Sequence, residues 1–255
     1  MGASRFIALT LLLALSVTAT LLLIMHFAQP VPASYPPREC SLAEVDSAYR
    51  AKIHGGAEII AATIQARAEF DSADDAEALV FKAQVSANEQ AGTITPQERE
   101  QLFNAIAAYR FVRDRIHYNV GTVGIAAAQD DLATLSARSG KCDEKSLLLV
   151  SMLLHLNISS GMEALSSSNE ISEEACAQEG LCSCLMRADH AVVAAELPAF
   201  KKLMTFEGAP HYKNATYCTK GSRIIIDPSC SSCPFAYGKN CTVSIPILTM
   251  AANQG

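Results

Sequence analysis

The stretch SGKCDEKSLLLVSMLLHL, residues 139–156, decides the fold. From residue 143 onward its apolar side chains cover most faces of a helix, which predicts a central helix buried on nearly all sides. Cys142 stands where this helix begins, and the positive end of the helix dipole together with free backbone N–H groups favours a thiolate there. Lys141 and Lys145 would add to that effect. The sequence therefore predicts a central helix that begins at Cys142, which is either a reactive thiol or a thiol packed in the core.

The periodicity of the chain changes on either side of this helix. Before it, apolar residues recur at three- and four-residue steps and predict further helices. After it, the period falls to two, and residues 162–165, 190–197 and 223–227 are predicted to be strands. Helices first and strands later are typical of an α+β fold and not of an alternating parallel one. His190 opens the second of these strands, and Asp227 closes the third.

Cys142, His190 and Asp227 together have the chemistry of a cysteine nucleophile with its two supporting groups. A histidine beside the thiol can take its proton and later return it to a leaving group. A carboxylate on the far ring nitrogen fixes the tautomer and stabilises the imidazolium. If the strands that carry His190 and Asp227 are neighbours, the two side chains meet at the strand ends.

At this point the sequence resembles the transglutaminase-like superfamily of papain-related cysteine enzymes. The resemblance covers nearly half of the chain and rests on FVRDRIHY (111–118), SGKCDE (139–144), residues 158–164, DHAV (189–192) and IDP (226–228). It implies a central helix that carries the cysteine and packs on an antiparallel sheet. It also implies Cys142 as nucleophile, His190 as general base and acid, and Asp227 as the orienting carboxylate.

The sequence departs from the family pattern in its aromatic residues. Family members often have Trp shortly after the histidine and along the substrate channel, whereas this chain has no Trp. The second donor to an oxyanion is therefore unidentified. The backbone N–H of Cys142 is the first candidate, and a side chain from residues 118–131 could supply the other. The acidic insert between residues 165 and 190 is interpreted as a flap over the cleft.

The N-terminal segment is long and apolar. Residues 6–27 contain no formal charge, and 22 residues at 1.5 Å each roughly match the 30 Å hydrocarbon core of a bilayer. We expect an uncleaved membrane anchor. A signal peptide cleaved after Ala33 and a buried core helix are the alternatives. An anchor and a cleaved signal peptide would both export the rest of the chain.

Four regions follow from composition and helix signals. Residues 1–27 are the anchor or signal, 28–39 a proline-rich tether, and 40–94 a helical spacer or cover without chemistry of its own. Residues 95–250 are expected to form the catalytic domain. This domain begins at TPQE (95–98), where threonine can cap a helix, proline suits its first position and glutamate reaches back to the cap.

The net charge and the cysteine content restrict the possible classes of function. A net charge of −6 without any basic run argues against a nucleic-acid binder. Nine cysteines in an exported chain favour disulfides, with one left over, although Cys182-x-Cys184 and Cys230-x2-Cys233 could also form a zinc site. We expect disulfides, and neither metal nor cofactor.

These observations predict a membrane-anchored, extracytoplasmic cysteine hydrolase or acyltransferase that acts on amide bonds of proteins or peptides through a Cys142 thioester. Peptide hydrolysis is favoured, because no calcium-loop pattern or accessory sandwich domain accompanies the motif. The alternative is a catalytically silent, disulfide-rich binding module of the same fold. The redox state of Cys142 separates the two, since a sulfur in a disulfide cannot attack.

Overall fold

The computed structural model describes residues 41–120, 128–165, 188, 190–204, 219–220, 223–230 and 244–252. All of them belong to one compact unit, Glu39–Gly255. The expected anchor, tether and flap lie outside the described residues, as do seven of the nine cysteines. None of the described helices has the length and apolar character needed to span a membrane.

Four helices come before the short elements that lead to the predicted central helix. They are α2 (Leu42–Arg50), α3 (Ala57–Ser72), α4 (Ala76–Gln90) and α5 (Pro96–Arg115). Their boundaries follow local signals. Thr95 caps α5 and Glu98 reaches back to it, which confirms the predicted capping box. Asp75 caps α4 through the N–H of Ala78.

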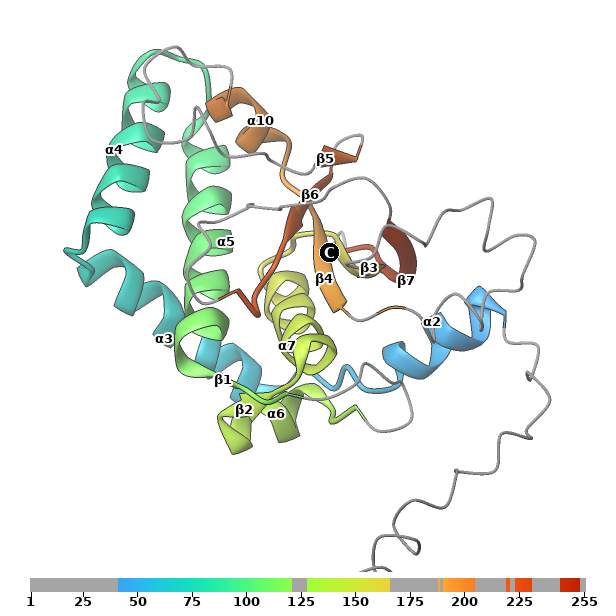
Figure 1. Cartoon of the computed structure of the whole chain (residues 1–255). Helices are drawn as coiled ribbons and strands as arrows, with labels where there is room; N and C mark the ends of the chain where they lie inside the picture. The colour runs from blue at the N-terminus through green and yellow to red at the C-terminus, as the bar shows by residue number, and fades with distance from the viewer. Residues whose placement is uncertain are drawn as a thin grey trace, which may run out of the picture. The chain divides into compact units, whose positions relative to one another are not determined.

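The short elements β1 (His117–Tyr118), α6 (Asp131–Ala137) and β2 (Ser139–Gly140) lead to α7 (Cys142–His155). This is the predicted central helix, and residues 142–153 are all buried. It packs on the sheet on one side and against α3, α5 and α6 elsewhere, and in Figure 1 it lies between α5 and the sheet. Burial on several sides explains why apolar residues cover most of its surface.

The sheet has the order β5-β6-β4-β3-β7, and every neighbouring pair is antiparallel. Its strands are β3 (Ser160–Leu165), β4 (His190–Glu196), β5 (Thr219–Lys220), β6 (Arg223–Ile226) and β7 (Ser244–Met250), with the helix α10 (Pro198–Met204) after β4. The predicted strands β3, β4 and β6 are confirmed. The strands β5 and β7 are not predicted by the sequence pattern.

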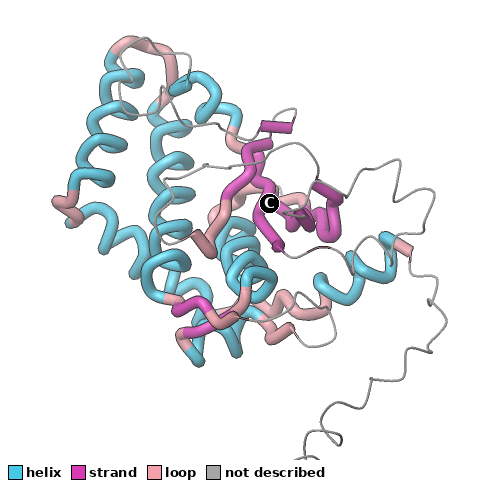
Figure 2. Tube along the Cα trace, viewed as in Figure 1, coloured by secondary structure: helices cyan, strands magenta, loops and turns pink. Residues whose placement is uncertain are grey.

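The described residues thus form a mixed α+β fold with an antiparallel sheet, in agreement with the predicted class (Figure 2). Its main core is continuous, running from Val45 and Ile59 in the first helices through α7 to Leu248 in β7. The helices before residue 95 therefore pack on the same core as α7. The boundary between residues 94 and 95 stays a prediction.

Candidate active site

His190 and Asp227 meet because their strands are neighbours. His190 is the first residue of β4, and Asp227 directly follows β6. The antiparallel register sets Val193 opposite Ile226, so the end of β6 lies beside the start of β4. His190 Nε2 lies 2.8 Å from Asp227 Oδ2. The imidazole and the carboxylate thus form the expected pair.

Cys142 completes the group from the start of α7. It is fully buried and a free thiol, and it lies near enough to His190 to raise the pKa of the ring. Since Nε2 of the ring is bonded to Asp227, Nδ1 is the ring nitrogen left for the sulfur. The structure therefore brings all three predicted side chains together, in the order sulfur, imidazole, carboxylate.

The environment of His190 favours its charged form. Burial lowers the pKa of the ring, but the hydrogen bonds to Asp227 and Cys142, with their charges, outweigh burial and raise the pKa from 6.5 to about 10. A charged ring beside a thiol is the partner that a thiolate requires. The ring is therefore charged at neutral pH and can stabilise negative charge that develops on a neighbouring sulfur.

Tyr118 is a fourth group at the sulfur. Burial, then the charge of Cys142 and a hydrogen bond to it, raise the pKa of Tyr118, so the phenol keeps its proton and can donate. It is 44% exposed. The sequence indicates only that some side chain of residues 118–131 could act here. The one signal was the place of Tyr118 at the end of the FVRDRIHY segment.

Two short parallel strands hold Tyr118 near Cys142. In β1 and β2, His117 pairs with Ser139 and Tyr118 with Gly140. The N–H of His117 donates to the carbonyl of Arg138, which has a left-handed φ of 53°. Such a φ is unfavourable for a residue with a Cβ, so the surrounding contacts must maintain this turn.

Glu144 organises the start of α7. Its carboxylate accepts the N–H of Lys141 at 2.8 Å and the N–H of Gln129 at 2.9 Å. It is almost completely buried, as is its neighbour Asp143. The acidic residue three positions into the helix therefore satisfies free backbone groups at the helix start, in the manner of one half of a capping box.

A second cluster resembles a metal site in its composition. Ligand atoms of His54, Asp130 and Asp131 lie within 4.8 Å of one another. Asp131, however, accepts the N–H groups of His54, Gly55 and Leu132 and the hydroxyl of Ser151. Its oxygens are engaged in joining three segments of the chain, so we assign the cluster a structural role.

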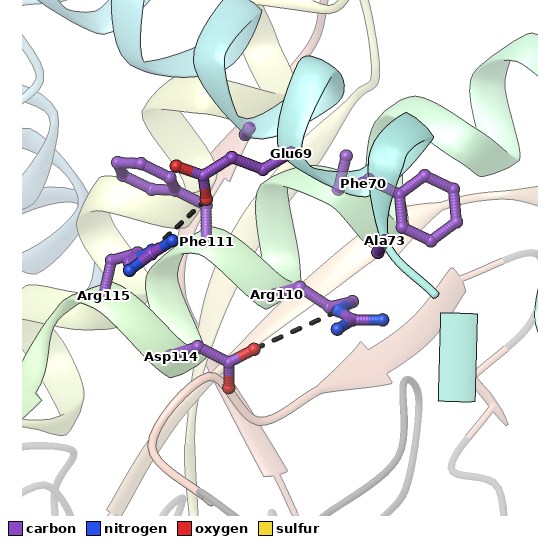
Figure 3. A pocket seen from close by; sticks show the side chains of 9 residues that line it. Glu69, Phe70, Ala73, Arg110, Phe111, Asp114 and Arg115 are labelled. Carbon is purple, nitrogen blue, oxygen red and sulfur yellow. Dashed lines mark hydrogen bonds and ion pairs between the residues drawn. The ribbon is translucent and has the colours of Figure 1, made fainter. Parts of the chain in front are cut away.

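A cavity of about 210 Å³ lies between α3 and α5 (Figure 3). Two basic and two acidic side chains line it, and they form pairs. Arg115 contacts Glu69 at 3.2 Å, and Arg110 lies 4.0 Å from Asp114. Because these charges already face one another, we assign no ligand to this cavity.

The two cysteines among the described residues differ in their bonding state. Cys230 is disulfide-bonded, whereas Cys142 is free. A disulfide sulfur cannot act as a thiolate ligand, so Cys230 does not fit the zinc alternative. The other cysteines of the two candidate zinc pairs lie outside the described residues.

Comparisons with known proteins leave the family open. No protein-family model matches the chain, and no curated protein matches it significantly. A solved structure that resembles part of it is the crystal structure of a candidate protease from Parabacteroides distasonis, at 13% identity and a TM-score of 0.32. The match covers 71% of this chain and 31% of that structure. A likeness at this level carries no argument, and the transglutaminase-like assignment stays a prediction.

Proposed function

We propose that the chain is a transglutaminase-like cysteine hydrolase or acyltransferase that acts on amide bonds in proteins or peptides, with peptide hydrolysis as its main reaction. The observation that carries this proposal is the 2.8 Å hydrogen bond between His190 and Asp227, on a ring whose other nitrogen is left for the free thiol Cys142.

The chemistry proceeds in two halves. The Cys142 sulfur attacks the carbonyl carbon, a C–S bond forms, and the carbonyl electron pair moves to oxygen. The backbone N–H of Cys142 and the Tyr118 hydroxyl are the proposed donors to that oxyanion. As the intermediate collapses, the C–N bond breaks and His190 gives its proton to the departing amine.

The thioester is then resolved by water or by an amine. His190, now neutral, takes a proton from the incoming nucleophile as that group attacks the thioester carbonyl. The C–S bond breaks and the sulfur leaves as a thiolate beside the restored imidazolium. Asp227 stabilises the charged ring at both stages. Hydrolysis and transfer differ only in which nucleophile reaches the thioester.

We further propose that the catalytic unit lies outside the cytoplasm, tethered by residues 6–27. The disulfide at Cys230 supports this, because such bonds persist in oxidising compartments. A membrane-impermeant thiol reagent added to intact cells tests this location. Labelling of Cys142 by an impermeant reagent supports the proposal, and labelling only after lysis contradicts it.

The test of the reaction is acylation of Cys142 in the full-length, unreduced chain. Iodoacetamide should modify Cys142 at pH 7 faster than it modifies a model thiol. A peptide p-nitrophenyl ester should leave an acyl group that hydroxylamine removes, detected by intact mass and peptide mapping. The variant Cys142→Ser should lose the thioester while its free energy of unfolding changes by less than about 2 kcal/mol.

A matched pair of histidine variants controls for general damage. His190→Ala should slow acylation strongly, while His155→Ala, an exposed residue at the other end of α7, should leave it unchanged. Capture of the acyl group by Cys142→Ser, or equal effects of the two histidine variants, would remove the assignment. Complete absence of acylation would favour the silent binding module.

A further inference from the structure

A tight turn follows β6 and connects Asp227 to a disulfide. Residues 227–230 read Asp-Pro-Ser-Cys, and Pro228 and Ser229 form the turn itself. Aspartate before proline is typical of such a turn, because proline presets its own φ and the aspartate side chain can accept a backbone N–H two residues on. Cys230, at the end of the turn, is disulfide-bonded. The carboxylate that pairs with His190 therefore lies close in the chain to a covalent cross-link.

Both oxygens of the Asp227 carboxylate are held by hydrogen bonds. Oδ2 lies 2.8 Å from Nε2 of His190, and Oδ1 accepts the N–H of Ser229 at 2.9 Å. A carboxylate that is held at one oxygen can still rotate about its last side-chain bond, whereas one that is held at both oxygens keeps a single orientation. The Ser229 N–H thus keeps Oδ2 directed at the ring.

The turn is constrained on both sides. Before it, β6 pairs with β4, and Ile226 lies opposite Val193. After it, the disulfide joins Cys230 to one of the seven cysteines outside the described residues, because Cys142 is a free thiol. The Ser229 N–H lies between these two constraints, one residue before the cross-link. The disulfide is therefore placed to limit how far this N–H can move from Asp227.

We infer that the turn 227–230 is a positioning element of the same site, in which the disulfide at Cys230 holds the Ser229 N–H against Asp227 and so keeps the carboxylate aligned with the His190 ring. The inference rests on the proposed function. An aligned carboxylate stabilises the charged ring and fixes its orientation. When the disulfide opens, the turn loses its second constraint and the N–H can leave the carboxylate. The chain is therefore fully active only where this disulfide persists, in an oxidising compartment.

The test compares the oxidised and the reduced full-length chain. A trialkylphosphine opens the disulfide: the S–S bond breaks, two thiols form, and the phosphine becomes its oxide with the oxygen of water. Reduction should lower the pKa of the His190 ring by about 1, because the carboxylate that raises it is no longer held in place. NMR titration measures this, with the signal assigned by its loss in His190→Gln. Acylation of Cys142 at saturating ester should slow by about 10-fold.

Cys230→Ser controls for the other disulfides of the chain. It should show the lower pKa of His190 before any phosphine is added, and phosphine should then change the titration no further. A second variant opens the same disulfide without altering the turn: peptide mapping identifies the partner of Cys230, and that cysteine is changed to serine. It should behave as Cys230→Ser does.

If phosphine lowers the pKa of His190 equally in the unaltered chain and in Cys230→Ser, or in neither, the inference is wrong. Amide exchange in the oxidised chain decides the matter should reduction or the cysteine variants unfold the protein. The Ser229 amide should exchange slowly in the unaltered chain and faster in Asp227→Ala, which removes the acceptor and keeps the disulfide. Equal exchange rates would overturn the inference. Titration and exchange need no substrate, so failure of the proposed function remains distinguishable.

Discussion

The helical layer of α3, α4 and α5 and the region around Cys142 use charged side chains in opposite ways. In the layer, arginines of one helix meet acids of the next. The pairs that join helices, or a helix and a neighbouring cap, are Arg67–Glu100, Arg99–Glu89, Arg110–Asp75, Arg113–Glu77 and Arg115–Glu69. Around Cys142, by contrast, Asp143, Glu144 and Lys145 are buried, and His190 and Asp227 are mostly so.

The difference lies in how far water reaches each charged side chain. Ion pairs that water reaches are screened and contribute little to stability, so those of the layer mainly keep the helices in register. A buried charge interacts strongly with its neighbours and has its pKa displaced. His190 and Lys145 both show such displacement. The comparison predicts that changes near Cys142 affect chemistry, and changes in the layer affect stability slightly.

The largest expected effect is on the site. Asp227→Asn should lower the pKa of His190, because it removes the leading contribution that raises it, and should slow acylation of Cys142 by about 10³-fold or more. Stopped-flow release of p-nitrophenol measures the rate. Glu196→Gln, exposed at the other end of β4, is the control and should have no effect. Equal acylation rates for the two variants would contradict the proposed role of Asp227 in the site.

The same pair makes stability depend on pH in a defined direction. The pKa of His190 is higher in the folded chain, about 10, than the ordinary 6.5 of an unfolded one. Its contribution is therefore complete below about pH 6.5 and disappears as the pH rises toward 10. The difference in Tm between the unaltered chain and Asp227→Asn should shrink over that interval. A difference that grows with pH would contradict this assignment.

A change in the sheet should affect folding without affecting chemistry. A Cβ at Gly161 in β3 would collide with the backbone carbonyl of Leu248 in β7. Gly161→Ala should therefore reduce the free energy of unfolding by about 3 kcal/mol, near the upper end for overpacking. Urea denaturation measures this loss. The protein that remains folded should still be alkylated at Cys142 at the usual rate.

Within the helical layer, we expect substitution of Arg113 to reduce the free energy of unfolding most. Its side chain is 9% exposed, contacts Glu77 at 2.7 Å and lies over the Tyr109 ring. Arg113→Met should cost about 1–2 kcal/mol, because it leaves the carboxylate of Glu77 without this partner. Thermal unfolding of Arg113→Met, Glu77→Gln and the double variant gives the pairwise term. A term near zero would show that burial adds nothing to this pair.

The smallest effect is expected at the rim of the cavity in Figure 3. Arg115 is 57% exposed at its side chain and contacts Glu69 at 3.2 Å. Arg115→Ala should change the free energy of unfolding by less than about 1 kcal/mol, and less still at high salt. Chemical denaturation at two salt concentrations tests this. A loss comparable to that of Gly161→Ala would erase the distinction between the two regions.

Local signals were sufficient wherever neighbours along the chain define the structure. Thr95 and Glu98 lie three residues apart, so their capping box is visible in the sequence and forms as predicted. The apolar pattern of α7 likewise indicated a buried helix. The strand β7 was missed because it carries Pro246 and few alternating residues, and only its pairing with β3 defines it.

The sequence by itself determined the buried helix α7, the strands β3, β4 and β6, and which three side chains have complementary chemistry, because periodicity, caps and residue type act over a few positions. Tertiary structure alone decided that β4 and β6 are neighbours, that Tyr118 lies near Cys142, and that Lys145 donates to the carbonyl of Ile116. These contacts join residues 24 to 37 positions apart along the chain. They depend on loop closure and burial in a shared core, which no local pattern encodes.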